Sequence, residues 1–89
     1  MAVNRRAAKR DSNERPIIDA LRAAGASVEQ LSKKGVPDLL VGFQGRTYLM
    51  EVKDGKGKLT PDEATWIGAW GGSVSIVRTI EEALEVIGR

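Results

Sequence analysis

The chain has 89 residues, 14 basic and 12 acidic side chains, a formal net charge of +2, and neither cysteine nor histidine. This length suits one domain with a small core, for which oligomerisation is a common source of extra stability. The lack of histidine excludes Ser-His and Cys-His catalysis, and the lack of cysteine excludes disulfides and thiolate zinc sites. The groups that remain available for catalysis are carboxylates, lysines and a metal ion. With no apolar run of membrane-spanning length and no signal peptide, we expect a cytoplasmic protein and no membrane partner.

Positive charge is concentrated at the N-terminus. Residues 1–15 carry five basic and two acidic side chains, a net charge of +3, whereas the rest carries nine basic and ten acidic ones, a net charge of −1. A basic arm on a near-neutral body indicates contact with a nucleic-acid backbone, and a solvated tail is the alternative. We therefore expect a basic arm over residues 1–10 and one domain over residues 11–89. The candidate DNA-binding residues of the arm are Arg5, Arg6, Lys9 and Arg10.

The first regular element is expected to be a helix over residues 13–24. Asn13, or Ser12 before it, can cap its N-terminus, and Gly25 can end it. Glu14 shares a helix face with apolar residues, which directs a carboxylate inward. It either leans over the sheet edge towards a metal or merely favours the positive end of the helix dipole. The residues on this face are Glu14, Ile17, Ile18 and Leu21.

A weakly alternating strand is expected over residues 26–31, followed by a turn at residues 32–34. Lys33 and Lys34 lie in this turn, just before the Gly-Val-Pro-Asp segment at residues 35–38. They are candidates for phosphate contact, and solvated turn lysines are the equally plausible alternative.

The next two strand-like runs predict a β-hairpin, because they flank a short glycine-containing connection. If Gln44 and Gly45 form the turn, Asp38 stands directly opposite Glu51. A turn longer by two residues shifts the pairing but keeps both carboxylates on one face, since side chains alternate with period two. Lys53 joins that face, whereas Tyr48 and Val52 point to the other one.

Two carboxylates facing each other across a hairpin repel, and a folded chain tolerates them if a cation neutralises them or one takes a proton. Oxygen ligands favour a hard ion such as Mg²⁺ or Mn²⁺, which retains waters and accepts phosphate oxygens. A lysine beside such an ion can orient a water or hold charge that develops on a phosphate. The pattern of Asp38, Glu51 and Lys53 therefore predicts a metal-dependent site for phosphodiester hydrolysis.

The segment after Lys53 is a glycine- and lysine-rich loop over residues 54–58, in which Lys56 and Lys58 are candidates to track the DNA backbone. A helix then starts at a capping box formed by Thr60 and Glu63 and runs to residue 70. The aromatic and aliphatic residues along one side of this helix are expected to be core or subunit-interface anchors: Trp66, Ile67 and Trp70.

A last strand over residues 73–77 and a final helix from Thr79 complete an α/β fold with the order αβββαβα. We expect a mixed four-stranded sheet flanked by helices. The crossover from the second hairpin strand through the Thr60 helix to the last strand is right-handed. It places Glu51 and Lys53 at the carboxyl end of a strand, where open α/β sheets hold their sites.

The segments that carry this chemistry also resemble a known family. Pro37-Asp38, followed after a spacer by Glu51-Val52-Lys53, resembles the signature of the PD-(D/E)XK nuclease superfamily. The segments Gly35-Val36-Pro37-Asp38-Leu39 and Gly57-Lys58-Leu59-Thr60-Pro61 are similar to those of its VRR-Nuc (virus-type replication-repair nuclease) domains. The resemblance covers roughly residues 11–88.

The resemblance implies a Mg²⁺- or Mn²⁺-dependent DNA endonuclease. Asp38, Glu51 and the backbone carbonyl of Val52 would hold the metal, Glu14 would contact it directly or through water, and Lys53 would act on the attacking water or the transition state. The family commonly has glutamine where Glu63 stands, so Glu63 either contacts the metal or its water or only caps its helix. Unaccompanied domains of the family resemble Holliday-junction resolvases, which implies a structure-specific homodimer.

Two other functions compete with this interpretation. A non-catalytic module could bind branched or duplex DNA with the same lysines, although paired carboxylates that repel phosphate argue against it. A strand-transfer enzyme could use Tyr48, but alternation places that side chain on the face opposite Glu51. The sequence leaves open whether the substrate is a junction, a flap or a duplex.

Overall fold

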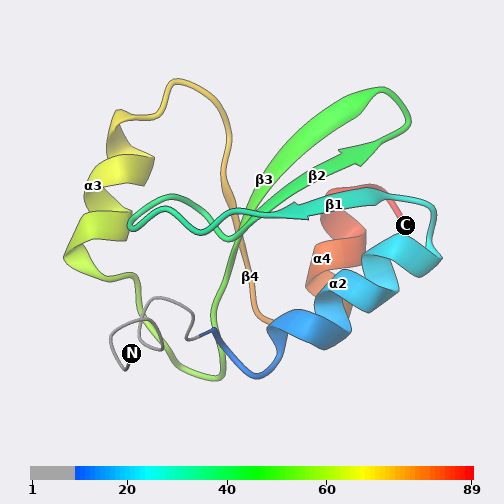
Figure 1. The fold of residues 1–89 in the computed structure, drawn as a ribbon, viewed down its shortest axis with the longest axis horizontal. Helices are drawn as coiled ribbons and strands as arrows, with labels where there is room; N and C mark the ends of the chain where they lie inside the picture. The colour runs from blue at the N-terminus through cyan, green and yellow to red at the C-terminus, as the bar shows by residue number, and fades with distance from the viewer. Residues whose placement is uncertain (1–9) are drawn as a thin grey trace.

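A computed structural model describes residues 10–89 as a layered α/β domain (Figure 1). Its four strands form one mixed sheet in the order β1-β2-β3-β4, with β3 and β4 parallel and the other pairs antiparallel. The predicted order αβββαβα is confirmed. The elements are α2 (Glu14–Ala23), β1 (Ser27–Gln30), β2 (Leu39–Phe43), β3 (Arg46–Val52), α3 (Pro61–Ala69), β4 (Ser75–Val77) and α4 (Ile80–Val86).

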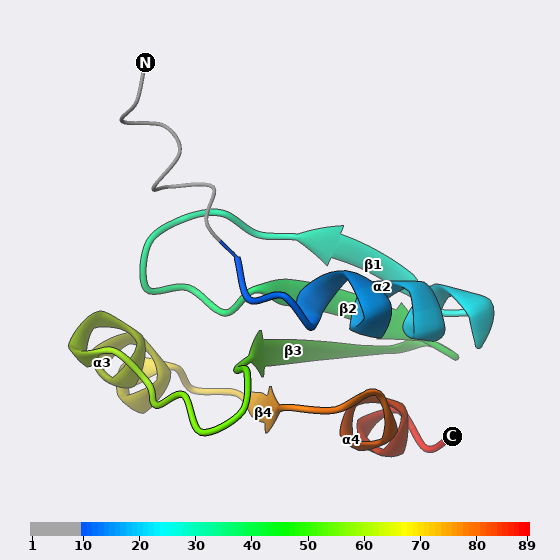
Figure 2. The same cartoon turned by 90° about the horizontal axis from the view of Figure 1, so that it is seen from below.

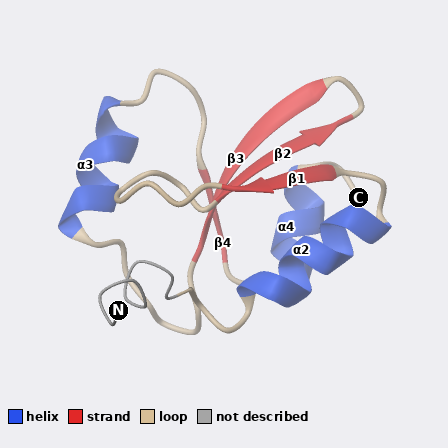
Figure 3. Cartoon of the chain, in the orientation of Figure 1, coloured by secondary structure: helices blue, strands red, loops and turns tan. Residues whose placement is uncertain are grey.

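Helices α2 and α4 pack side by side on one face of the sheet, α2 next to β1 and α4 next to β4 (Figures 1 and 2). The core lies between these helices and the strands, because every second strand residue turns an apolar side chain towards them. Helix α3 lies apart from both, across the strands (Figure 3). The main buried side chains are Ile17, Ile18, Leu21, Val28, Leu39, Val41, Met50, Val52, Val77 and Ala83. Over residues 10–89, no helix has the length and apolar character needed to cross a membrane.

The hairpin of β2 and β3 has the predicted two-residue turn. Gln44 and Gly45 have φ angles of 51° and 80°, and a tight turn with two left-handed residues matches the twist of the strands it joins. Leu39 pairs with Met50, so the next residues along are Asp38 and Glu51. The predicted register is therefore confirmed, and both carboxylates lie on the sheet face opposite α2 and α4.

The structure corrects two expectations. Asn13 occupies the N-cap position of α2, but its side chain makes no capping hydrogen bond. The expected core role of the α3 side chains is wrong within this chain, since α3 has no buried residue. Trp66 and Trp70 instead stack on each other, with ring centroids 4.7 Å apart, and Trp70 is 47% exposed.

The Asn13 amide ties three elements together instead of capping one. Its Nδ2 donates to the carbonyl of Lys53 (3.0 Å), just after β3, and to the carbonyl of Arg78 (2.9 Å), just after β4. Removing one partner of a part-buried hydrogen bond costs about 1–3 kcal/mol. We expect Asn13→Ala to lower the free energy of unfolding by that amount in urea titrations. Ser12→Ala, which removes an exposed hydrogen bond to Asp54, is the control, and equal losses in both variants would contradict the role of Asn13.

Candidate active site

The carboxylates of Asp38 and Glu51 face each other at the end of the hairpin. Asp38 immediately precedes β2, and its Oδ2 accepts a hydrogen bond of 2.8 Å from the backbone N–H of Val52. Glu51 is 1% exposed, and its Oε1 is buried without a hydrogen-bond partner among the described residues. A buried carboxylate oxygen without a partner is costly. The pair therefore presents an oxygen that is ready for a cation or a proton.

The electrostatics of the pair follow from burial and mutual repulsion. Burial raises the pKa of Glu51 to about 8, and the negative charges of Asp38 and Glu63 act in the same direction. The pKa of Asp38 is also raised, first by burial, although the Val52 N–H opposes the shift. With no metal bound, Glu51 therefore holds a proton near neutral pH, which is one of the two ways in which such a pair is tolerated. A divalent cation would displace that proton.

Lys53 extends the site along the same face. Its Nζ lies 2.7 Å from Glu63 Oε1 and 3.5 Å from Glu51 Oε2. Burial alone would lower the pKa of Lys53, but its contacts with these two carboxylates outweigh burial and raise it. The lysine is thus a cation held between two acids.

Glu63 is fixed at this position by the start of α3. It forms the predicted capping box with Thr60, whose N–H donates to Glu63 Oε1 (2.8 Å) and whose hydroxyl accepts from the Glu63 N–H (3.2 Å). Burial would raise the pKa of Glu63, but the hydrogen bonds from Lys53 and Thr60 lower it. Glu63 therefore both caps α3 and holds Lys53, a second role that the capping pattern in the sequence does not indicate.

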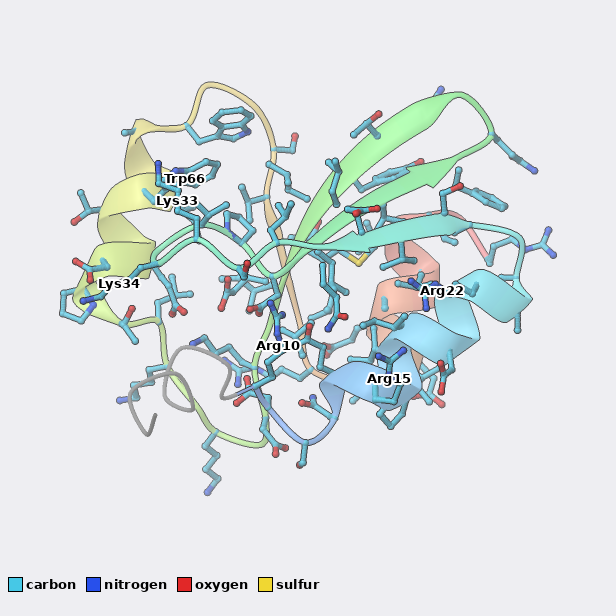
Figure 4. All side chains as sticks on the ribbon, viewed as in Figure 1. Arg10, Arg15, Arg22, Lys33, Lys34 and Trp66 are labelled. Carbon is cyan, nitrogen blue, oxygen red and sulfur yellow. The ribbon has the colours of Figure 1, made fainter. Side chains whose placement is uncertain are left out.

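Glu14 reaches the site from the first turn of α2, as its inward face predicted. It is 3% exposed, and its Oε2 accepts from Arg10 Nη1 (2.6 Å) and from Gln30 Nε2 (3.1 Å). Arg10 Nη1 also lies 3.9 Å from Asp38 Oδ1. The structure therefore places Arg10 among the carboxylates at the end of the sheet (Figure 4). The predicted basic arm includes Arg10, and in the structure this residue pairs with Glu14 just before α2 begins.

The other basic candidates lie around this centre. Lys34 Nζ is 3.3 Å from Asp62 Oδ2, which brings the turn at residues 33–36, predicted at residues 32–34, beside the start of α3 (Figure 4). Lys33, Lys56 and Lys58 are exposed. The expected contacts of Arg5, Arg6 and Lys9 lie outside the described residues.

Arg78 is a residue that sequence reasoning missed. Its Nη1 donates to the carbonyls of Gly55 (2.9 Å) and Gly57 (2.8 Å). The lysine-rich loop over residues 54–58 is therefore anchored to the end of β4. Its lysine side chains are presented to solvent from a backbone that is held in place.

The residues present fit a hard divalent metal at Asp38 and Glu51. Both donors are carboxylates, and one buried oxygen lacks a partner. Within residues 10–89, no three acidic side chains converge closely enough to form a metal cage by themselves. Mg²⁺ is commonly held by one or two carboxylates, with waters and phosphate oxygens at its remaining positions. The Val52 carbonyl stays a predicted further ligand.

The mixed sheet with the element order αβββαβα carries the buried carboxylate pair and the lysine at one end. No family model matches the sequence, and no curated protein matches it. Among solved structures, a chain described as "VRR_NUC domain" is similar, with a TM-score of 0.63 and 27% identity over 83% of this chain and 88% of that one. This match supports a VRR-Nuc domain and confirms the resemblance seen in the motifs. It also supports nuclease activity in general.

Proposed function

We propose that the protein is a DNA endonuclease that depends on Mg²⁺ or Mn²⁺. The observation that carries this proposal is the buried pair of Asp38 and Glu51, with an unpartnered Glu51 oxygen, next to Lys53. The likeness to a VRR_NUC domain supports the reaction class. A surface made only for binding DNA gains nothing from buried acids that repel phosphate.

Each residue of the centre has a defined task. Asp38, Glu51 and the Val52 carbonyl would hold the metal, which when bound would polarise the phosphate and lower the pKa of a water. Asp38 is oriented for this by the Val52 N–H. Lys53 directs its ammonium group along the same face and would orient the attacking water or stabilise charge that develops on the phosphate. Glu63 holds Lys53 in place during this step.

DNA affinity would come from cations around the centre. Lys33 and Lys34 precede Asp38 in the chain, and Lys56 and Lys58 follow Lys53 on the loop that Arg78 anchors. Contacts of this kind bind the phosphate backbone without reading sequence. We assign the same task to the arm residues Arg5, Arg6 and Lys9.

A structure-specific enzyme acting as a homodimer is the finer part of the proposal. The sheet face that carries Glu51 is not covered by α2 or α4. It holds the exposed Leu40 (38%) and Ile76 (43%). A groove of about 430 Å³ lies between this face and α3, and all its lining residues are uncharged. The uncharged groove gives two such faces an apolar surface on which to meet about a twofold axis.

If the protein dimerises through this face, new charge on the face should separate the two protomers. We expect the Leu40→Lys, Trp70→Lys double variant to sediment as a monomer and to lose preference for branched DNA, because lysines buried at the interface would oppose each other. Glu85→Lys, an exposed change on α4, is the control and should leave the mass unchanged. A wild-type protein that sediments as a monomer at micromolar concentration would contradict the dimer but not the nuclease.

A gel assay with matched junction, flap and linear DNA tests the substrate. With Mg²⁺, we expect cleavage of the junction at the highest rate. Equal rates on all three substrates would leave an endonuclease without structure specificity. Tight binding without any product in Mg²⁺ or Mn²⁺ would instead favour the non-catalytic DNA-binding module.

A further inference from the structure

The guanidinium group of Arg10 lies between the carboxylates of Glu14 and Asp38. Together with Glu51, these two residues form the carboxylate cluster of the site. Arg10 Nη1 lies 2.6 Å from Glu14 Oε2 and 3.9 Å from Asp38 Oδ1. Its Nη2 donates to the carbonyl of Leu31 at 2.6 Å. The side chain is 24% exposed. Contacts to two acids and a backbone carbonyl hold the guanidinium more firmly than a single surface ion pair would.

The two oxygens of Asp38 have different neighbours. Oδ2 accepts from the Val52 N–H, on the side of β3 and Glu51, whereas Oδ1 is the oxygen near Arg10. The cluster therefore offers two places for positive charge, one between Asp38 and Glu51 and one between Asp38 and Glu14. Arg10 fills the second place, while the unpartnered Glu51 Oε1 belongs to the first.

Glu14 is committed to this arrangement. One of its oxygens receives hydrogen bonds from both Arg10 and Gln30, and the carboxylate is buried. An arginine cannot lose its proton in a protein, so it supplies a permanent charge. Glu14 thus holds Arg10 beside Asp38 through one of its two oxygens.

We propose that Arg10 is a positioning residue that provides the second cation of the centre, so that each protomer binds one divalent metal ion, between Asp38 and Glu51. This inference rests on the proposed function. The base of the basic arm thereby becomes part of the active site. Without Arg10, Glu14 and Asp38 form an uncompensated carboxylate pair that is open to a second ion.

The number of bound Mn²⁺ ions, counted from the electron paramagnetic resonance signal of free Mn²⁺, tests the inference. We expect one ion per protomer in the wild type and in Arg10→Lys, and two in Arg10→Gln, the second binding at least tenfold more weakly. Arg15→Gln is a matched control, because Arg15 also pairs with an acid four residues on, at 3.6 Å, on an exposed surface. It should bind one ion with wild-type affinity.

Glu14→Gln gives an independent test if Arg10→Gln does not fold. We expect it to bind one ion with a dissociation constant within about threefold of the wild type, because the ion does not contact Glu14. A loss of tenfold or more would make Glu14 a ligand and overturn the inference. Two ions in the wild type, or one in folded Arg10→Gln, would overturn it while leaving the nuclease proposal intact. No ion in the wild type would overturn both.

Discussion

The Glu51→Gln variant should cleave DNA at least about a hundredfold more slowly than the wild type, since an amide cannot supply the negative charge that holds the metal. DNA affinity measured in EDTA near neutral pH should not change, because metal-free Glu51 is protonated there and glutamine is likewise neutral. Glu81→Gln changes an exposed glutamate on α4 and should keep the wild-type rate. A Glu51→Gln variant that cleaves at the wild-type rate would exclude this carboxylate from the centre.

The same variant should change how stability depends on pH. Folding raises the pKa of Glu51 from 4.5 to about 8, so between these values the folded state binds more protons than the unfolded state. This group therefore costs no stability below pH 4.5, and stability falls as the pH rises towards 8. The loss is at most about 1.4 kcal/mol per pH unit.

Urea unfolding in EDTA at pH 5, 6, 7 and 8 measures this dependence. We expect the free energy of unfolding of the metal-free wild type to decline across the series and that of Glu51→Gln to decline much less. At pH 8 the variant should be the more stable protein. Parallel declines in both proteins would show that Glu51 is not the titrating group.

Lys53→Ala is the second change with a large expected effect. The turnover rate should fall about a hundredfold or more, while the DNA dissociation constant should change little, because the lysine acts at the transition state. Single-turnover rates at saturating enzyme separate the two quantities. A variant that binds DNA weakly but keeps its rate constant would make Lys53 a phosphate anchor only.

Lys56→Ala is the matched control for Lys53, since both are lysines near the end of β3 but Lys56 is exposed on the loop. It should leave the single-turnover rate unchanged. It should also lower the slope of log affinity against log salt by about one unit for a lost phosphate contact.

The hairpin could be predicted from the sequence because two local rules fix it. A two-residue turn at Gln44 and Gly45 sets the register, and the period of two then decides the face of every side chain. The position of Asp38 opposite Glu51 follows from these two rules alone. The inward position of Glu14 followed in the same way from helical spacing.

The positions of Arg10 and Asn13 could not be predicted in this way, because their partners are distant in the sequence. Arg10 reaches Leu31 and Asp38, and Asn13 reaches Lys53 and Arg78. Local rules place Arg10 in the basic arm, four residues before Glu14, and make Asn13 a helix cap, but they do not indicate these distant partners. Which distant carbonyls lie within reach depends on how α2 packs on the sheet, and that is a property of the assembled fold.

The side chains of α3 show a different limit. A helix with Trp66, Ile67 and Trp70 on one side was expected to bury them, and the apolar pattern was sound. An apolar pattern indicates which face of a helix is hydrophobic. It does not indicate which other part of the protein, or which partner, covers that face. Here the chain's own core lies on the other face of the sheet, so Trp66 and Ile67 stay half-buried and Trp70 stays exposed in the single chain.

The central claim is that Asp38 and Glu51 hold a divalent metal that hydrolyses DNA, and metal-dependent strand cleavage tests it most directly. End-labelled junction DNA is incubated with wild type and with Asp38→Asn, in Mg²⁺ and in EDTA. We predict product only for the wild type in Mg²⁺. Cleavage by the wild type in EDTA, or by Asp38→Asn in Mg²⁺ at the wild-type rate, would contradict the proposed centre.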